Sequence, residues 1–102
     1  MQNLKIKAVP LEFALHENYP NPFNPSTTFR FDLPEITDAS IIIYNMLGQK
    51  IKTFDMPNTP AGYHSLTWDA TNDLGAPVSA GVYLYQLQTK GFVKTKKMIL
   101  LK

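Results

Sequence analysis

The sequence Thr28-Phe29-Arg30-Phe31-Asp32-Leu33 alternates polar and apolar side chains without a break. Successive side chains of a β-strand point to opposite faces of the sheet. The stretch therefore places Phe29, Phe31 and Leu33 on one face, against three polar residues on the other. Pro34 follows directly and cannot donate a ladder hydrogen bond, so it ends the pattern. We predict a half-buried strand here.

The same two-residue period recurs along the chain, and no segment shows a helical period. Further strands are predicted at residues 40–44, 49–56, 63–68, 82–89 and 92–101. Hairpin loops fall at Asn45–Gly48 and Lys90–Gly91, and breaker-rich segments at residues 57–62 and 69–81. Six or seven short strands predict an all-β fold, an antiparallel sandwich of the immunoglobulin or fibronectin III type with about seven strands. Trp68 is expected to be its largest buried side chain.

A chain of 102 residues without cysteine is long enough for one domain, whose stability comes from core packing alone. We assign residues 15–102 to the immunoglobulin-like domain and residues 1–14 to a linker or an extra edge strand, since residues 4–9 also alternate. No apolar run is long enough to span a membrane, and the first ten residues lack the apolar core of a signal peptide. We expect a piece of a larger protein, with any signal peptide on its precursor.

The charge is unevenly distributed. Residues 74–102 contain five lysines and no acidic residue, whereas the whole chain has a net charge of only +2. This basic end could meet phosphate, an anionic membrane surface or an acidic receptor. Lysines also mark the solvent face of an edge strand, where they discourage aggregation. The five lysines lack the interleaved aromatic residues on which proteins stack the bases of single-stranded nucleic acid, so no nucleic-acid partner is expected.

The residues offer little for catalysis. None of the four serines lies in a Gly-x-Ser-x-Gly elbow, the acidic residues are scattered, and no phosphate-binding glycine loop occurs. His64 alternates with two core positions and is expected to be partly buried and satisfied, while His16 is expected at the surface. Residues 69–75 space oxygen donors as a calcium loop does, but their glycine is one position late and no closing glutamate follows. We predict a turn with Asx bonds, no metal, no cofactor and no enzyme.

Residues 15–28 contain three X-Pro pairs within seven residues. Each proline fixes its own φ and moves the preceding residue out of the helical region, so the segment is a pre-shaped turn that costs little entropy to order. It can present Tyr19 and Phe23 as aromatic anchors. Their target is either the domain's own core or a partner.

From Leu15 to Lys102 the chain resembles the type A C-terminal sorting domain of proteins exported by the type IX secretion system, an immunoglobulin-like module. Related modules occur in the flagellar hook-capping scaffold. The resemblance rests on six motifs in order: Asn18-Tyr-Pro-Asn-Pro-Phe-Asn-Pro-Ser-Thr27, Tyr44-Asn-Met-Leu-Gly-Gln49, Gly62-Tyr-His-Ser-Leu-Thr-Trp-Asp69, Gly75, Ser79-Ala-Gly-Val-Tyr83 and Lys97-Met-Ile-Leu-Leu-Lys102.

The resemblance implies a non-catalytic address label at the C-terminus of an exported passenger. Its partners would be outer-membrane translocon components and the upstream passenger of the same precursor, with transit through the periplasm to the cell surface or the medium. The last strand would offer its edge or its charge to the receptor. The motif positions that would serve recognition are Pro20, Asn21, Pro22, Phe23, Gly81, Tyr83, Lys97, Met98, Ile99 and Leu100.

Two alternatives remain open. An immunoglobulin-like binding or spacer module of a secreted polysaccharide-degrading enzyme or adhesin would expose aromatic residues on one sheet face. Tyr63, Tyr83 and Tyr85 are the candidates, although the last two share a face that could point inward. The other alternative is an assembly domain of the flagellar cap type.

Overall fold

A computed structural model describes residues 9–101, which form seven strands and no helix. The strands are β1 (Ala14–Leu15), β2 (Thr27–Leu33), β3 (Thr37–Asn45), β4 (Lys50–Thr59), β5 (Gly62–Trp68), β6 (Gly81–Gln88) and β7 (Val93–Leu100). The all-β prediction is confirmed. The strand considered at residues 4–9 falls outside the described residues except for Val9, which lies in no strand.

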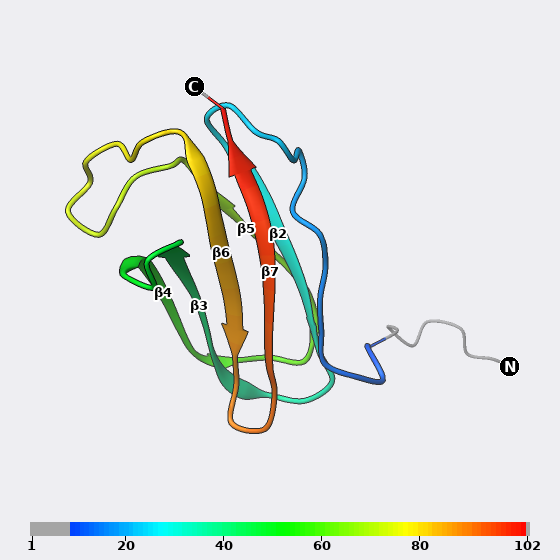
Figure 1. Cartoon of the computed structure of the whole chain (residues 1–102). Coiled ribbons are helices and arrows are strands. Elements are labelled where there is room, and N and C mark those ends of the chain that lie inside the picture. Colours follow the sequence, from blue (N-terminus) through cyan, green and yellow to red (C-terminus); the bar gives the residue numbers. More distant parts are fainter. Residues whose placement is uncertain (1–8, 102) are drawn as a thin grey trace, which may run out of the picture.

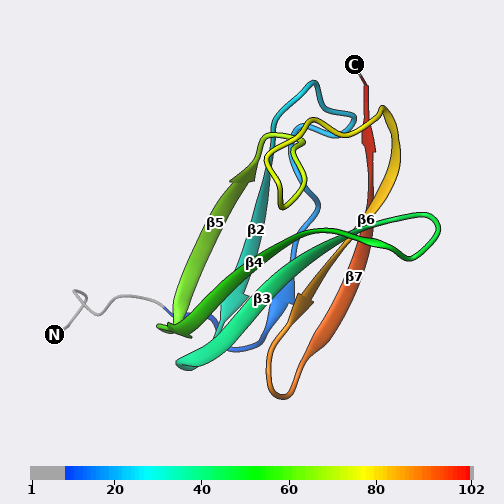
Figure 2. The same ribbon diagram turned by 90° about the vertical axis from the view of Figure 1, so that its left-hand side faces the viewer.

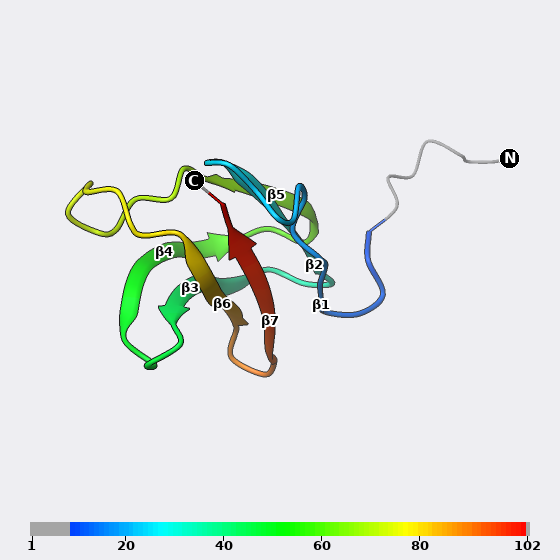
Figure 3. The same cartoon turned by 45° about the horizontal axis from the view of Figure 1, so that its top comes forward.

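Two antiparallel sheets pack face to face (Figure 1). One sheet has the order β1-β2-β5 and the other β4-β3-β6-β7. Figure 2 shows the two layers from the side. The stretch between β1 and β2, residues 16–26, is called the entry segment, and Figure 3 shows it running along β7. The predicted hairpin loop between β3 and β4 closes at Gly48, whose φ of 83° favours glycine and whose N–H donates to Asn45 O (3.0 Å).

The core lies between the sheets and follows the predicted alternation. Phe29, Phe31 and Leu33 of β2 are fully buried, as are the inward residues of β3 and β6. Trp68 is the largest fully buried side chain, as predicted, and its indole N–H donates to Thr71 O (2.8 Å). Burial of these side chains is the main source of stability in a chain without disulfides.

One detail differs from the sequence-based expectations. Strand β4 continues through Pro57 to Thr59, although Pro57 was assigned to a breaker segment. This is possible because β4 is an edge strand with a bulge opposite Asp38, where Asn58 has a φ of 51° and donates its N–H to Asp38 Oδ1 (2.8 Å). His16 lies at the surface, as expected, with 43% of its side chain exposed, and it pairs with Asp32.

Candidate functional site

Residues 19–25 of the entry segment, which hold the three X-Pro pairs and are called the Asn-Pro segment, are docked on the end of β7. Phe23 N–H donates to Ile99 O (3.0 Å) and Leu101 N–H donates to Phe23 O (2.8 Å), which forms a short parallel bridge. Asn21 Oδ1 accepts from Ile99 N–H (3.0 Å). The segment thus extends the four-stranded sheet beyond β7 at its last residues, beside the C-terminal end in Figure 1.

Phe23 also closes the core at this end of the sandwich. Its side chain is 1% exposed, and its ring lies 5.9 Å from the Trp68 ring, centroid to centroid. Trp68 in turn makes an edge contact with Tyr83 at 5.8 Å, and the Tyr83 hydroxyl donates to Ser79 O (2.6 Å). Of the two uses considered for Phe23, the structure shows packing into the domain's own core.

A second attachment holds the entry segment at the middle of the sheet. The Tyr85 hydroxyl donates to His16 O (2.8 Å) and accepts from Asn18 N–H (2.9 Å). Tyr85 is fully buried and stacks on Phe29, and burial raises the pKa of its hydroxyl to about 12. Asn18, itself buried, donates from Nδ2 to Thr27 Oγ1 (3.0 Å). These bonds satisfy backbone groups that would otherwise be unpaired at the start of the domain.

The structure brings all ten motif positions to this end of the sandwich, which we call the terminal corner. Gly81 pairs directly with Leu100 and Tyr83 with Met98, across β6 and β7. The Asn-Pro segment is bonded to the end of β7 through Phe23 and Asn21. The members of the terminal corner are Pro20, Asn21, Pro22, Phe23, Gly81, Tyr83, Lys97, Met98, Ile99 and Leu100.

Alternation along the strands divides the terminal corner into buried and exposed residues. Phe23, Tyr83, Met98 and Leu100 are buried in the core. Lys97 and Ile99 point the other way, to the outer face of the four-stranded sheet. Pro20, Asn21, Pro22 and Gly81 are exposed as well. A receptor that meets the folded domain can therefore contact these residues together with Lys97 and Ile99, and not the four buried side chains.

Apolar side chains continue the outer face around Lys97 and Ile99. Ile99 is 38% exposed and lies opposite Val82, while Lys97 lies opposite Leu84. Leu101 follows with an exposed fraction of 52%. We call this group the terminal face: Val82, Leu84, Lys97, Ile99 and Leu101.

The expectation that the end of β7 offers a free edge is wrong at Ile99. Both outward backbone groups of Ile99 are bonded, its N–H to Asn21 Oδ1 and its carbonyl to Phe23 N–H. β-Augmentation needs unpaired backbone groups, so the entry segment excludes it there. Further along β7, Lys96 Nζ pairs with Glu17 Oε2 (3.1 Å).

Sequence reasoning missed the residues that hold the entry segment in place. Tyr85 was considered for an exposed aromatic platform, but Tyr83 and Tyr85 both face the core, and of the three candidate tyrosines only Tyr63 is exposed. The signal was present in β6, where Gln86 and Gln88 mark the opposite face as the outer one. Nothing in the sequence pattern marked Asn18 as a buried polar residue.

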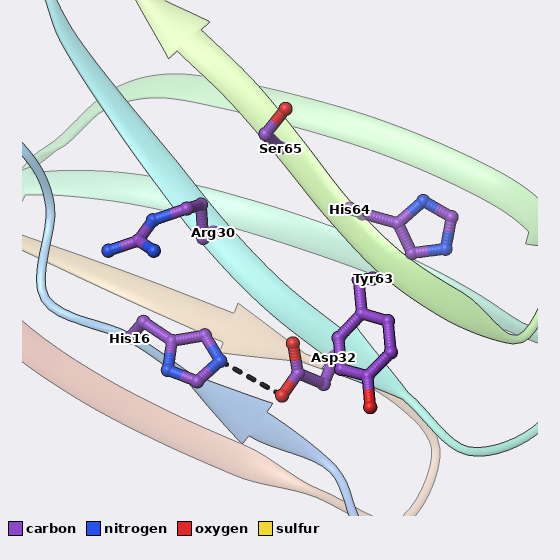
Figure 4. Close-up of a pocket in the computed structure, with 6 residues that line it drawn as sticks. All are labelled: His16, Arg30, Asp32, Tyr63, His64 and Ser65. Atoms are coloured by element: carbon purple, nitrogen blue, oxygen red, sulfur yellow. Dashed lines mark hydrogen bonds and ion pairs between the residues drawn. The ribbon is translucent and has the colours of Figure 1, made fainter. Parts of the chain in front are cut away.

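A second feature lies on the outer face of the three-stranded sheet. A hollow of about 260 Å³ is lined by His16, Arg30, Asp32, Tyr63, His64 and Ser65 (Figure 4). His16 Nε2 donates to Asp32 Oδ2 (2.9 Å). His64 faces the core, where its ring stacks on Phe31 and its Nε2 contacts Pro60 O (2.8 Å), in agreement with the predicted satisfied histidine.

The loop after β5 uses its side-chain oxygens within the chain. Asn72 Oδ1 accepts from the N–H groups of Leu74 and Ala76, and Asp73 Oδ1 accepts from Thr53 N–H. The Asn72 bonds are the predicted Asx bonds, whereas the Asp73 bond ties the loop to β4. Within residues 9–101 no three His, Asp or Glu side chains gather as metal ligands would, and that range holds no helix that could cross a membrane.

Comparison with known proteins identifies the family of the domain and the solved structures that share its fold. Residues 21–91 match the family described as the FlgD Ig-like domain. Dimeric latent PorU from Porphyromonas gingivalis has a TM-score of 0.72 at 22% identity, over 90% of this chain and 10% of PorU. PorZ, described as an essential bacterial surface component of the type IX secretion system of the same organism, has a TM-score of 0.59 at 18% identity, over 88% of this chain and 11% of PorZ.

FlgD from P. aeruginosa also has a TM-score of 0.59, at 21% identity, over 72% of this chain and 57% of FlgD. No curated protein matches the chain. The chain thus spans between a tenth and somewhat more than half of the length of these three structures. At identities this low, the likeness establishes a shared fold.

Proposed function

Since the chain belongs to the family of FlgD Ig-like domains, we propose that it is a non-catalytic sorting domain of the type IX secretion system, read by an outer-membrane receptor at the terminal face. One observation carries the proposal. Two motifs at opposite ends of the sequence are joined at one corner of the fold, with Asn21 and Ile99 in contact although 78 residues apart. A receptor that binds there meets the beginning and the end of the domain at once.

The exposed chemistry of the terminal face suits such a receptor. Apolar residues on the outer face of a sheet are normally scattered singly, whereas here Val82, Ile99 and Leu101 are exposed together around Lys97. A complementary surface would be apolar with an acidic group opposite Lys97. By this proposal the domain passes through the periplasm behind a passenger and ends at the cell surface or in the medium.

The family name alone also fits an assembly domain of the flagellar cap type. The family match ends at residue 91, before β7. The share of the chain covered does not favour either function, since PorU covers 90% of it and two FlgD structures cover 89%. The features that favour sorting lie in β7 and in its contact with the entry segment. A flagellar scaffold found upstream of this domain in its full-length protein would support the alternative.

Deletion of Met98–Lys102 is a poor test, because Met98 and Leu100 are fully buried and the truncated domain loses core. Surface substitutions separate recognition from folding. The test variant is Lys97→Glu/Ile99→Ser. The matched control is Lys94→Glu/Val93→Ser, which makes the same charge reversal and a similar replacement of a β-branched apolar residue by serine, at exposed positions of the same strand.

Residues 15–102 are fused behind a signal peptide and a reporter, in a host that has the type IX system. We expect the wild-type and control fusions to reach the surface or the medium, and the test variant to stay in the periplasm. All three domains should show similar cooperative thermal transitions. Equal export of the test variant and the control, or no export of the wild-type fusion, would count against the proposal.

A further inference from the structure

The hollow on the three-stranded sheet is separate from the terminal corner and has its own chemistry. Outward residues of three adjacent chain segments form it: His16 beside β2, Arg30 and Asp32 on β2, and Tyr63 and Ser65 on β5. They point outward because the alternate residues of β2 and β5 fill the core. The hollow therefore has a rigid floor of paired strands.

Several polar groups in the hollow are unused by the folded chain. Asp32 Oδ2 is bonded to His16, but Oδ1 accepts no hydrogen bond from any described residue. Arg30, which lies opposite Ser65, forms no ion pair within residues 9–101. The hollow thus presents several N–H and O–H donors and one strong acceptor in a small area.

Tyr63 adds an aromatic surface. Its side chain lies opposite Asp32 in the strand register and is 64% exposed (Figure 4). The face of an aromatic ring carries partial negative charge, so it attracts the slightly positive C–H groups of a flat ligand. A ligand that stacks on Tyr63 brings its polar rim next to the Asp32 carboxylate.

We infer that this hollow binds one pyranose ring of a neutral polysaccharide. The C–H face of the ring packs on Tyr63, its hydroxyls donate to Asp32 Oδ1, and the Arg30 guanidinium donates to its oxygens. The opposite charges of Arg30 and Asp32 balance, which suits a neutral ligand better than an anion. An apolar ligand would leave these groups unpaired, at a cost that a polyhydroxyl ligand avoids. This binding does not depend on the proposed sorting function.

The test is a titration of the isotope-labelled domain by NMR with three soluble neutral polysaccharides, laminarin, xylan and galactomannan, and with the acidic polysaccharide alginate. A shallow site for one sugar ring should bind with a Kd on the order of 1 mM. We expect at least one neutral probe to shift the amide signals of Arg30, Asp32 and Tyr63, and Tyr63→Ala to weaken that binding about tenfold or more.

Two variants show whether the ring and the hollow are responsible. Tyr63→Phe keeps the stacking face and should retain most of the affinity. Tyr19→Ala removes another tyrosine, 74% exposed and outside the hollow, and should bind as the wild type does. The inference is overturned if no neutral probe binds, if Tyr63→Ala binds with unchanged affinity, or if alginate alone binds. None of these results bears on export.

Discussion

Replacement of Phe23 by alanine tests whether the Asn-Pro segment is part of the folded core. The side chain is 1% exposed and contacts Trp68, so the substitution removes a buried ring and leaves a cavity at the end of the sandwich. Such changes cost about 3–5 kcal/mol. In a domain of this size each kcal/mol lowers Tm by roughly 4–8 °C, which predicts a fall of roughly 12–40 °C.

Thermal and urea unfolding followed by circular dichroism measure the loss, and Asn24→Ala is the matched control. Asn24 is exposed beside Phe23, and its substitution should change stability by no more than about 0.5 kcal/mol. Amide exchange adds a local readout, since Leu101 N–H donates to Phe23 O and should exchange faster in Phe23→Ala. A loss below about 1 kcal/mol, with unchanged protection of Leu101, would refute the view that this segment is docked.

Four further predictions concern other parts of the fold. Tyr85→Phe should cost roughly 1–3 kcal/mol in urea unfolding, because it leaves the buried Asn18 N–H without its acceptor. Burial raises the pKa of Tyr85 from 10.0 to about 12, so the unfolded chain loses this proton first and wild-type stability should fall between about pH 10 and pH 12; an equally steep fall in Tyr85→Phe would contradict this. Gly81→Ala should cost about 1 kcal/mol in the same assay, since φ is +150° at Gly81 while no atom lies within 4 Å of the added Cβ; an unchanged unfolding midpoint would show that the strain is absent. Millimolar calcium should leave Tm within about 1 °C, because the oxygens of Asn72 and Asp73 are engaged by backbone N–H groups; a rise of several degrees would indicate a site.

Much of the fold could be predicted from local pattern, because strand alternation is a local property. Phe29, Phe31 and Leu33 lie on the buried face as predicted, and the hairpin turns fall where glycine and asparagine allow them. Pro57 shows the limit of such rules. A proline excludes a central strand position, but whether a strand is central or at an edge depends on the whole sheet.

The sequence motifs name the ten residues proposed for recognition, but they do not predict how these residues are arranged. The X-Pro pairs fix the local shape of residues 19–25, yet nothing local indicates that Phe23 pairs with the end of β7. That contact depends on a hydrogen-bond register between distant segments. The burial of Tyr83 and Tyr85 depends likewise on which face of β6 meets the other sheet.

The bridge between Phe23 and the end of β7 makes the integrity of one end of the domain depend on the other. A protease that removes the residues from Ile99 onward takes away both backbone partners of Phe23, and the entry segment is released together with the trimmed strand. In the opposite direction, a cut between Asn21 and Phe23 separates Asn21 from the rest of the domain, and its release leaves Ile99 N–H without an acceptor while Phe23 N–H still donates to Ile99 O. Damage at either end thus changes the surface at the same corner, so a receptor that binds there distinguishes an intact domain from a nicked one.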